Sequence, residues 1–207
     1  MQTTTSVIVG AARLSPADVV AVARHHAHVV IADEARERVA AARAVIDGLA
    51  ADPHPHYGVS TGFGALATTF IAPDRRRQLQ LSLIRSHAAG TGPEVETEVV
   101  RALQLLRLQT LASGHTGVRP LVVDTYAAML NAGVTPIVRE YGSLGCSGDL
   151  APLSHVALAA MGEGDVRDAS GELRPAADAL ATAGIEPLVL VEKEGLALIN
   201  GTDGMLG

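Results

Sequence analysis

The sequence predicts a mainly α-helical protein with small β accessories. Helix-start signals, in which proline or an acidic residue follows a capping position, precede most of the apolar segments. Apolar residues within those segments recur near helical spacing, as Val95, Val99, Leu103 and Leu106 do. Strand patterns are few and short. With 207 residues, 48% of them hydrophobic, the chain is long enough to bury a substantial core.

Seven segments carry helix signals. The clearest start is Ser15-Pro16-Ala17-Asp18, which combines a hydroxyl cap, proline at the first helical position and an acid at the third. The first predicted helix begins at Ser15, the second spans Asp33–Leu49, and the third runs from Pro73 to about Ala89. The fourth begins at Pro93-Glu94, the fifth spans Pro120–Leu130, the sixth spans Asp149–Met161, and the seventh runs from Glu192 to the end.

Three short segments favour strands. Val7-Ile8-Val9 and Pro136-Ile137-Val138 are apolar and too short for helices. Val166-Arg167 and Leu173-Arg174 flank the turn sequence 168–171, which predicts a hairpin.

Composition excludes several classes of function. A formal net charge of −6 argues against nucleic-acid binding. No apolar run approaches the ~20 residues that span a bilayer, and no signal peptide is visible. The single cysteine, Cys146, excludes an internal disulfide framework and a cysteine zinc cage, so we expect a cytoplasmic protein.

The only lysine is Lys193, which lies between Glu192 and Glu194. Two neighbouring carboxylates would raise the pKa of this amine. The sequence therefore argues against Schiff-base chemistry, which needs a neutral amine.

The segment Tyr57–Gly64 is a glycine-punctuated polar loop, YGVSTGFG. Its glycines permit close backbone approach, and Tyr57 is a candidate proton-transfer group. An ordinary tight loop explains the same composition equally well.

A second glycine-rich loop, Gly142–Leu150, leads directly into an apolar helix. Neither Ser143 nor Ser147 fits the Gly-x-Ser-x-Gly elbow of serine hydrolases, and no P-loop lysine follows. What remains is Ser147-Gly148 at a helix N-terminus, where the helix dipole favours developing negative charge. The alternative is that Ser147 or Asp149 merely caps the helix.

Histidines form two clusters, His25-His26-x-His28 and His54-x-His56. Neither has acidic or cysteine partners in a metal-ligand pattern nearby, so we expect no metal site. His87 and His155, taken alone, are expected to be structural.

Five segments in order resemble the aromatic amino-acid ammonia-lyase family, and its histidine-specific members most. They are Tyr57–Gly64, Ser86–Gly90, Gly114–Pro120, Gly145–Ser154 and Leu196–Thr202. The resemblance implies a mainly α fold of the fumarase/aspartase-like superfamily with small β hairpins. It also implies that residues 1–207 are the N-terminal domain, and that the central bundle of long helices is largely absent.

The resemblance further implies a cofactor built from the chain itself, 4-methylidene-imidazol-5-one (MIO), with no external cofactor. The amide nitrogen of Gly148 attacks the carbonyl of Cys146, two waters are lost, and Ser147 becomes the methylidene to which the substrate amine adds. Asp149 would help to hold the loop. Family members usually have alanine where Cys146 stands, but only the backbone carbonyl of that residue enters the ring.

Roles for five further residues follow from the same resemblance. Tyr57 is the base that takes the β-proton, so the site must stabilise its phenolate. Asn200 contacts the ring and its oxyanion. His87, with Ser86, lies in the pocket for the substrate side chain, which Gly64 also lines. A polar pair at 86–87 suits an imidazole, which both donates and accepts hydrogen bonds.

The implied reaction is the deamination of L-histidine to trans-urocanate and ammonia, the first step of histidine breakdown. Two alternatives stay open: a lyase or aminomutase acting on tyrosine or phenylalanine, and an inactive helical fragment. Ser60 stands where histidine-specific members usually have asparagine.

Family members continue for a long helical region that builds a homotetramer and supplies further catalytic groups. We therefore expect a chain truncated before that bundle. Its full-length form would bind an amino-acid substrate, without nucleic acid, membrane or metal.

Overall fold

The computed structural model describes residues 6–143 and 148–207. Most of the described residues outside loops are helical. The helices are α1 (Pro16–His25), α2 (Asp33–Ala51), the 3₁₀ turn η1 (Gly64–Leu66), α3 (Pro73–His87), α4 (Thr97–Ala112), α5 (Pro120–Asn131), α6 (Leu150–Ala160), α7 (Ala176–Thr182), α8 (Glu194–Ile199) and α9 (Asp203–Leu206). The mainly α prediction is confirmed.

The strands form three small sheets at the periphery. β1 (Ser6–Val9) pairs in parallel with β2 (His28–Ile31). β3 (Thr91–Glu94) pairs antiparallel with β5 (Arg139–Tyr141). β6 (Asp165–Arg167) lies between β4 (Thr135–Pro136) and β7 (Leu173–Pro175), antiparallel to both, so the predicted hairpin at 166–174 is confirmed.

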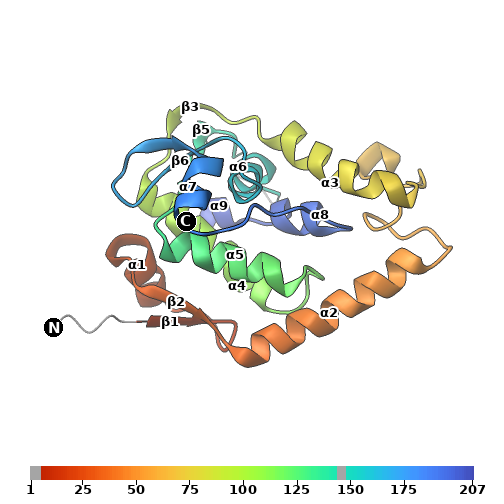
Figure 1. Cartoon of the computed structure of the whole chain (residues 1–207), viewed down its shortest axis with the longest axis horizontal. Coiled ribbons are helices and arrows are strands. Elements are labelled where there is room, and N and C mark those ends of the chain that lie inside the picture. Colours follow the sequence, from red (N-terminus) through yellow and green to blue (C-terminus); the bar gives the residue numbers. More distant parts are fainter. Residues whose placement is uncertain (1–5, 144–147) are drawn as a thin grey trace.

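The core lies around α4 and α5, which run through the middle of the molecule (Figure 1). Leu105, Leu108 and Leu111 of α4 are fully buried, as are Tyr126 and Met129 of α5. In Figure 1 α2 lies along one side of this pair, and α3 and α6 lie along the other. Burial of these apolar side chains is the main source of stability for such a layered helical arrangement.

Local sequence signals mark the starts of α1, α3 and α5. Ser15 accepts a hydrogen bond from the Asp18 backbone while the Asp18 side chain accepts from the Ser15 backbone, which completes the predicted capping box. Pro73 and Pro120 begin α3 and α5 as predicted.

Two predicted helices were placed wrongly. Pro93-Glu94 does not begin a helix, because this segment pairs with β5 as strand β3, and α4 begins at Thr97. The predicted helix from Glu192 to the end is two short helices, α8 and α9, separated at Asn200–Thr202. The break places the Asp203 carboxylate against the buried guanidinium of Arg107, an ion pair between distant parts of the chain.

The strand predicted at Pro136–Val138 is shorter, because only Thr135 and Pro136 pair with β6. Strand β2 and helix α7 were not predicted. None of the helices in the described part of the chain combines the length and apolar character needed to cross a membrane.

Candidate active site

The short helix α8 is the element around which the predicted site residues are arranged. Its first residue, Glu194, is fully buried, and its carboxylate accepts hydrogen bonds from three nitrogen atoms of Arg119 at 2.9–3.0 Å. The Val191 backbone N–H donates to the same carboxylate at 3.0 Å. A buried carboxylate with this many donors is well compensated, so α8 is firmly placed.

The loop that carries Tyr57 packs on α8. A Cβ atom on Gly58 would lie only 3.0 Å from the Leu196 side chain, so the loop backbone passes directly over the helix. Tyr57 is 55% exposed, and its ring meets Phe63 edge-on with centroids 6.2 Å apart. The Gly64 backbone N–H donates to the Tyr57 hydroxyl oxygen at 3.5 Å.

The base of that loop is tied together by His56. Its carbonyl accepts hydrogen bonds from the backbone N–H groups of Val59, Ser60 and Thr61 at 3.0–3.2 Å. Its ring Nε2 lies 2.9 Å from Asp52 Oδ2. Hydrogen bonds from the His54 backbone, the His56 ring and the His54 ring hold the pKa of Asp52 well below its usual range.

The loop before α6 reaches the other end of α8. The Asp149 backbone N–H donates to the Gly201 carbonyl at 2.9 Å, so Gly148 and Asp149 lie beside the Asn200–Gly201 turn. Gly148 has a φ of +91°, a conformation that L side chains rarely adopt. Cys146 and Ser147, the other two residues of the predicted ring, lie outside the described residues.

Asp149 precedes α6, but its side chain does not cap the helix. The capping interpretation is therefore wrong for this residue. The side chain is 1% exposed, and neither carboxylate oxygen has a hydrogen-bond partner in the described part of the chain. The α9 backbone covers it closely, because a Cβ on Gly204 would come within 2.7 Å of Asp149 Oδ2.

Asn200 ends α8 and is exposed. Its backbone carbonyl accepts a hydrogen bond from Arg107 Nη1 at 3.3 Å. The same guanidinium donates to the Ala197 carbonyl at 3.2 Å and pairs with Asp203. Arg107 thus fixes the turn that presents Asn200.

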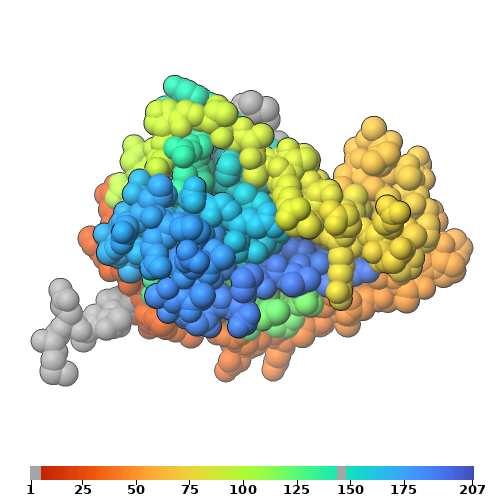
Figure 2. Space-filling model, turned by 45° about the horizontal axis from the view of Figure 1, so that its top comes forward, coloured from red at the N-terminus to blue at the C-terminus, as the bar shows by residue number. Residues whose placement is uncertain are grey.

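Ser86 and His87 end α3, which packs against α6 and α8. Figure 2 shows α3 in yellow beside the blue C-terminal segments. His87 Nδ1 lies 2.9 Å from the Leu83 carbonyl and 3.0 Å from Ser86 Oγ. A carbonyl only accepts, so Nδ1 carries the proton in the neutral ring and Nε2 is left as an acceptor.

His155 on α6 has a structural role, as predicted. Its Nε2 accepts a hydrogen bond from the Gly90 backbone N–H at 3.0 Å. Burial, and secondarily Arg139, lower the pKa of His155, which keeps the ring neutral and able to accept. The contact links the segment after His87 to α6.

The predicted site residues therefore fall into two groups. Packing on α8 brings the loop of Tyr57 and Gly64, the turn at Asn200, and Gly148-Asp149 onto one short helix. Ser86 and His87 belong to a neighbouring helix that is joined to α8 by the hydrogen bond from the Gly195 backbone to Gln80 Oε1, 2.8 Å long.

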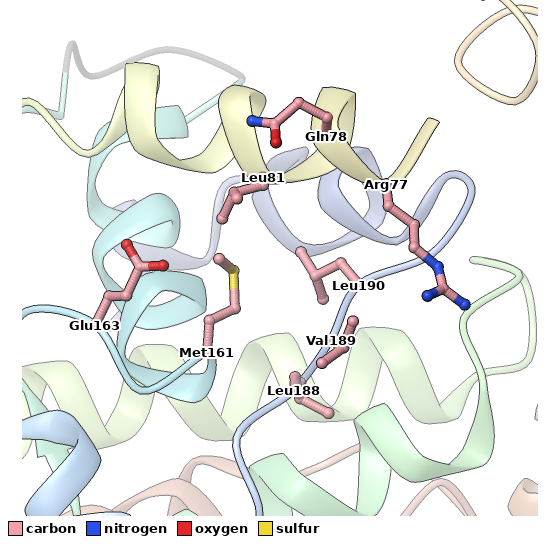
Figure 3. A pocket seen from close by; sticks show the side chains of 8 residues that line it. All are labelled: Arg77, Gln78, Leu81, Met161, Glu163, Leu188, Val189 and Leu190. Atoms are coloured by element: carbon pink, nitrogen blue, oxygen red, sulfur yellow. The ribbon is translucent and has the colours of Figure 1, made fainter. Parts of the chain in front are cut away.

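A separate hollow of about 290 Å³ lies between α3, the end of α6 and the segment 188–190 (Figure 3). Leu81, Met161 and Leu190 give it an apolar lining, and Arg77 and Glu163 are at its edge. None of the predicted site residues lines this hollow.

The prediction for Lys193 was wrong. Burial lowers the pKa of its amine. The two neighbouring glutamates, which were expected to raise this pKa, contact arginines instead. Glu194 pairs with Arg119, and Glu192 Oε1 lies 3.9 Å from an Arg76 nitrogen. Lys193 Nζ instead donates to the Thr116 carbonyl at 3.0 Å.

Sequence reasoning missed the buried polar residues that hold the site, chiefly Arg107, Arg119 and Gln80. A usable signal was present for Arg107, since an arginine within the apolar helix 95–111 must find buried partners. Its partners in α8 and α9 lie about 90 residues away in the chain, as Ala197 and Asp203 do.

Residues 14–207 match the family model of the aromatic amino acid lyases, so the chain belongs to that family.

Relatives with curated names are histidine ammonia-lyases. The protein from Streptomyces griseus is 63% identical over 202 residues, which are 98% of this chain and 39% of the relative. The one from Streptomyces avermitilis is 62% identical, with 98% and 40% covered. The chain thus spans about 40% of the length of these relatives.

Solved structures agree with the fold. The histidine ammonia-lyase of Trypanosoma cruzi is 41% identical with a TM-score of 0.89, covering 97% of this chain and 38% of that one. The tyrosine aminomutase of Streptomyces globisporus is 43% identical with a TM-score of 0.90 and the same coverage.

Proposed function

We propose that the full-length protein deaminates L-histidine without oxidation, giving trans-urocanate and ammonia. The identity of 62–63% to histidine ammonia-lyases over nearly the whole chain carries this proposal. The tyrosine aminomutase is less similar in sequence, at 43%, so a tyrosine substrate is the second candidate.

The arrangement of His87 supports an imidazole substrate. With Nδ1–H committed to the Leu83 carbonyl, the free ring position is an acceptor that suits the N–H of a second imidazole. The Ser86 hydroxyl donates to the same carbonyl at 3.0 Å, which fixes the end of the helix beside His87. We assign these two residues, with Gly64, to binding the substrate.

Tyr57 is the proposed base for the β-proton. Its hydroxyl is exposed to the space where substrate would enter, and it receives the Gly64 backbone N–H. Asn200 is exposed at the end of α8, and we assign its amide to stabilising negative charge near the reacting carbon.

The described residues fit an electrophile built from Cys146, Ser147 and Gly148. Gly148 has the left-handed conformation that glycine adopts readily, which suits a residue whose nitrogen must close a small ring. The Asp149 backbone is pinned to Gly201, which holds one end of the tripeptide. The methylidene-imidazolone supplies the electron sink that a poor leaving group such as ammonia requires.

Three features of the whole protein are part of the proposal. The residues described here would form the N-terminal domain of a longer lyase. That lyase would be a homotetramer, as the family resemblance implies. The cytoplasm is the proposed compartment, because a chain with one cysteine needs no oxidising environment.

The test uses the full-length protein without added cofactor and a panel of histidine, tyrosine and phenylalanine. We expect ammonia and urocanate from histidine, and much slower turnover of the other two. The Ser147→Ala variant should lose turnover, while Ser143→Ala, a matched change in the same segment, should keep it. Near-normal turnover by Ser147→Ala would contradict the mechanism, and faster turnover of tyrosine would contradict the substrate.

Intact mass gives an independent test of the ring. A chain of 207 residues that lacks the mass of two waters contains the ring, and the Ser147→Ala chain should then show its full mass. The full mass in the parent chain would identify it as an uncyclised fragment.

A further inference from the structure

A further pocket, beside α8, is basic. Its volume is about 190 Å³, and it lies between α4, the segment 113–117 and α8. The charged or polar residues that line it include Arg107, His115, Thr116, Lys193 and Asn200, and no acidic side chain of the described residues is among them.

Two polar groups of this pocket have no partner in the part of the chain that the structure describes. Arg107 is 1% exposed, and while its two terminal nitrogens are bonded, Nε is not. The hydroxyl oxygen of Thr116 is also buried and unpartnered. Buried donors without acceptors cost free energy, so such groups at a pocket indicate a ligand that accepts hydrogen bonds.

Lys193 supplies the charge of the pocket. Arg107 is neutralised by Asp203, whereas the ammonium of Lys193 donates to the Thr116 carbonyl and has no carboxylate of the described residues within ion-pair distance. Lys193 also has a φ of +66°, a left-handed conformation that is strained for a residue with a side chain.

We propose that this pocket binds a small oxyanion, a carboxylate or a phosphate monoanion, through Lys193 Nζ, Arg107 Nε and the Thr116 hydroxyl. Each is a donor, and one net positive charge matches one negative charge. The pocket shares Asn200 with the candidate active site, but binding of the anion needs neither the ring nor Tyr57.

The presence of a single lysine makes a sharp test feasible. Acetic anhydride modifies Lys193 and the N-terminal amine, and peptide mass measures both rates in one sample, with the N-terminal amine as the internal reference. Sodium phosphate at ten times its dissociation constant should slow Lys193 acetylation about tenfold relative to the reference, at constant ionic strength. Parallel arms with acetate and L-histidine show whether the pocket takes phosphate, carboxylates or both, and protection in any arm supports the proposal.

Two variants give the controls. Thr116→Val removes the hydroxyl but keeps the carbonyl that holds Lys193, and should weaken phosphate binding about tenfold by calorimetry. Arg75→Gln removes one positive charge from an exposed position of α3 and should change nothing. An unchanged ratio of acetylation rates in all three arms overturns the proposal, and so does full phosphate affinity in Thr116→Val.

Discussion

The Nε2 atom of His56 lies 2.9 Å from Oδ2 of Asp52, the residue that ends α2. This contact ties the turn that presents Tyr57 to a long helix, and the neighbouring ring of His54 binds the other carboxylate oxygen at 2.8 Å. Asp52, five positions before Tyr57, therefore helps to fix the position of the candidate base.

Asp52→Asn should lower kcat of the full-length protein by about tenfold, since small displacements of a reacting group are costly. KM should change little, because the substrate pocket at His87 is on another helix. Steady-state kinetics measure both. A change confined to KM would show that the turn does not position Tyr57.

The same pair predicts an effect of acid. Asp52 has a lowered pKa in the folded protein, so its contribution to stability is present above the ordinary aspartate pKa and is lost as pH falls through the folded value. The stability difference between parent and Asp52→Asn should therefore persist at pH 5 and disappear only in strong acid.

Tyr57→Phe should reduce turnover by about 10²–10⁴-fold, the range for loss of a general base. The ring contact with Phe63 is kept, so the loop should retain its conformation. Intact mass should still lack two waters, because the tyrosine has no part in ring formation. Tyr141→Phe, on an exposed strand, is the matched control and should keep full rate.

The pair Ser86→His and His87→Leu should move specificity toward tyrosine. Leucine removes the acceptor that suits the substrate imidazole, and the ratio of kcat/KM for histidine to that for tyrosine should fall by at least about tenfold. A substrate panel on the double variant measures this ratio. Unaltered preference would place the side-chain pocket away from the end of α3.

Glu194→Ala should destabilise the fold by about 3 kcal/mol, because Arg119 would lose its buried partner. Glu192→Gln, two residues earlier in the chain, removes only a 3.9 Å contact and should cost less than about 1 kcal/mol. Urea unfolding of both variants gives the comparison. Equal losses would mean that the carboxylate of Glu194 is not what fixes α8.

His155 should make stability fall on mild acidification. Its folded pKa is lowered by burial, so the unfolded chain takes up a proton first as pH falls below about 6.5. The contribution is complete above that pH and is lost as pH falls towards the folded value. His155→Gln should flatten the dependence of unfolding free energy on pH between 7.5 and 5, as measured by urea titration. The pH dependence that remains in this variant is expected to come from His26, whose pKa is also lowered by burial and by Arg101.

The parts of the fold governed by neighbouring residues were predictable from the sequence. The Ser15–Asp18 capping box and the prolines at 73 and 120 mark helix starts, and they depend only on residues a few positions away. The break between α8 and α9 was not predictable, because it depends on the Arg107–Asp203 ion pair, whose members are 96 residues apart.

The candidate site divides in the same way, into features that neighbouring residues determine and features that depend on distant contacts. Tyr57, Gly148 and Asn200 could be assigned from motifs, yet their common support on α8 could not, because it arises from contacts such as Gly58 with Leu196. Lys193 shows the opposite error. Its sequence neighbours suggested a raised pKa, whereas folding turned both glutamates toward arginines and left the amine half-buried.

Helix α8 is only six residues long. The loop of Tyr57, Gly148 before α6 and Asn200 are nevertheless all positioned by contacts with this helix or with the turn that follows it. Inserting one residue between Glu194 and Ile199 would rotate everything after it by about 100°. The rotated residues include the buried Leu198 and Ile199 and the Asp203 partner of Arg107, so the segment that orients the candidate site also carries part of the core, and its register cannot change without loss of both.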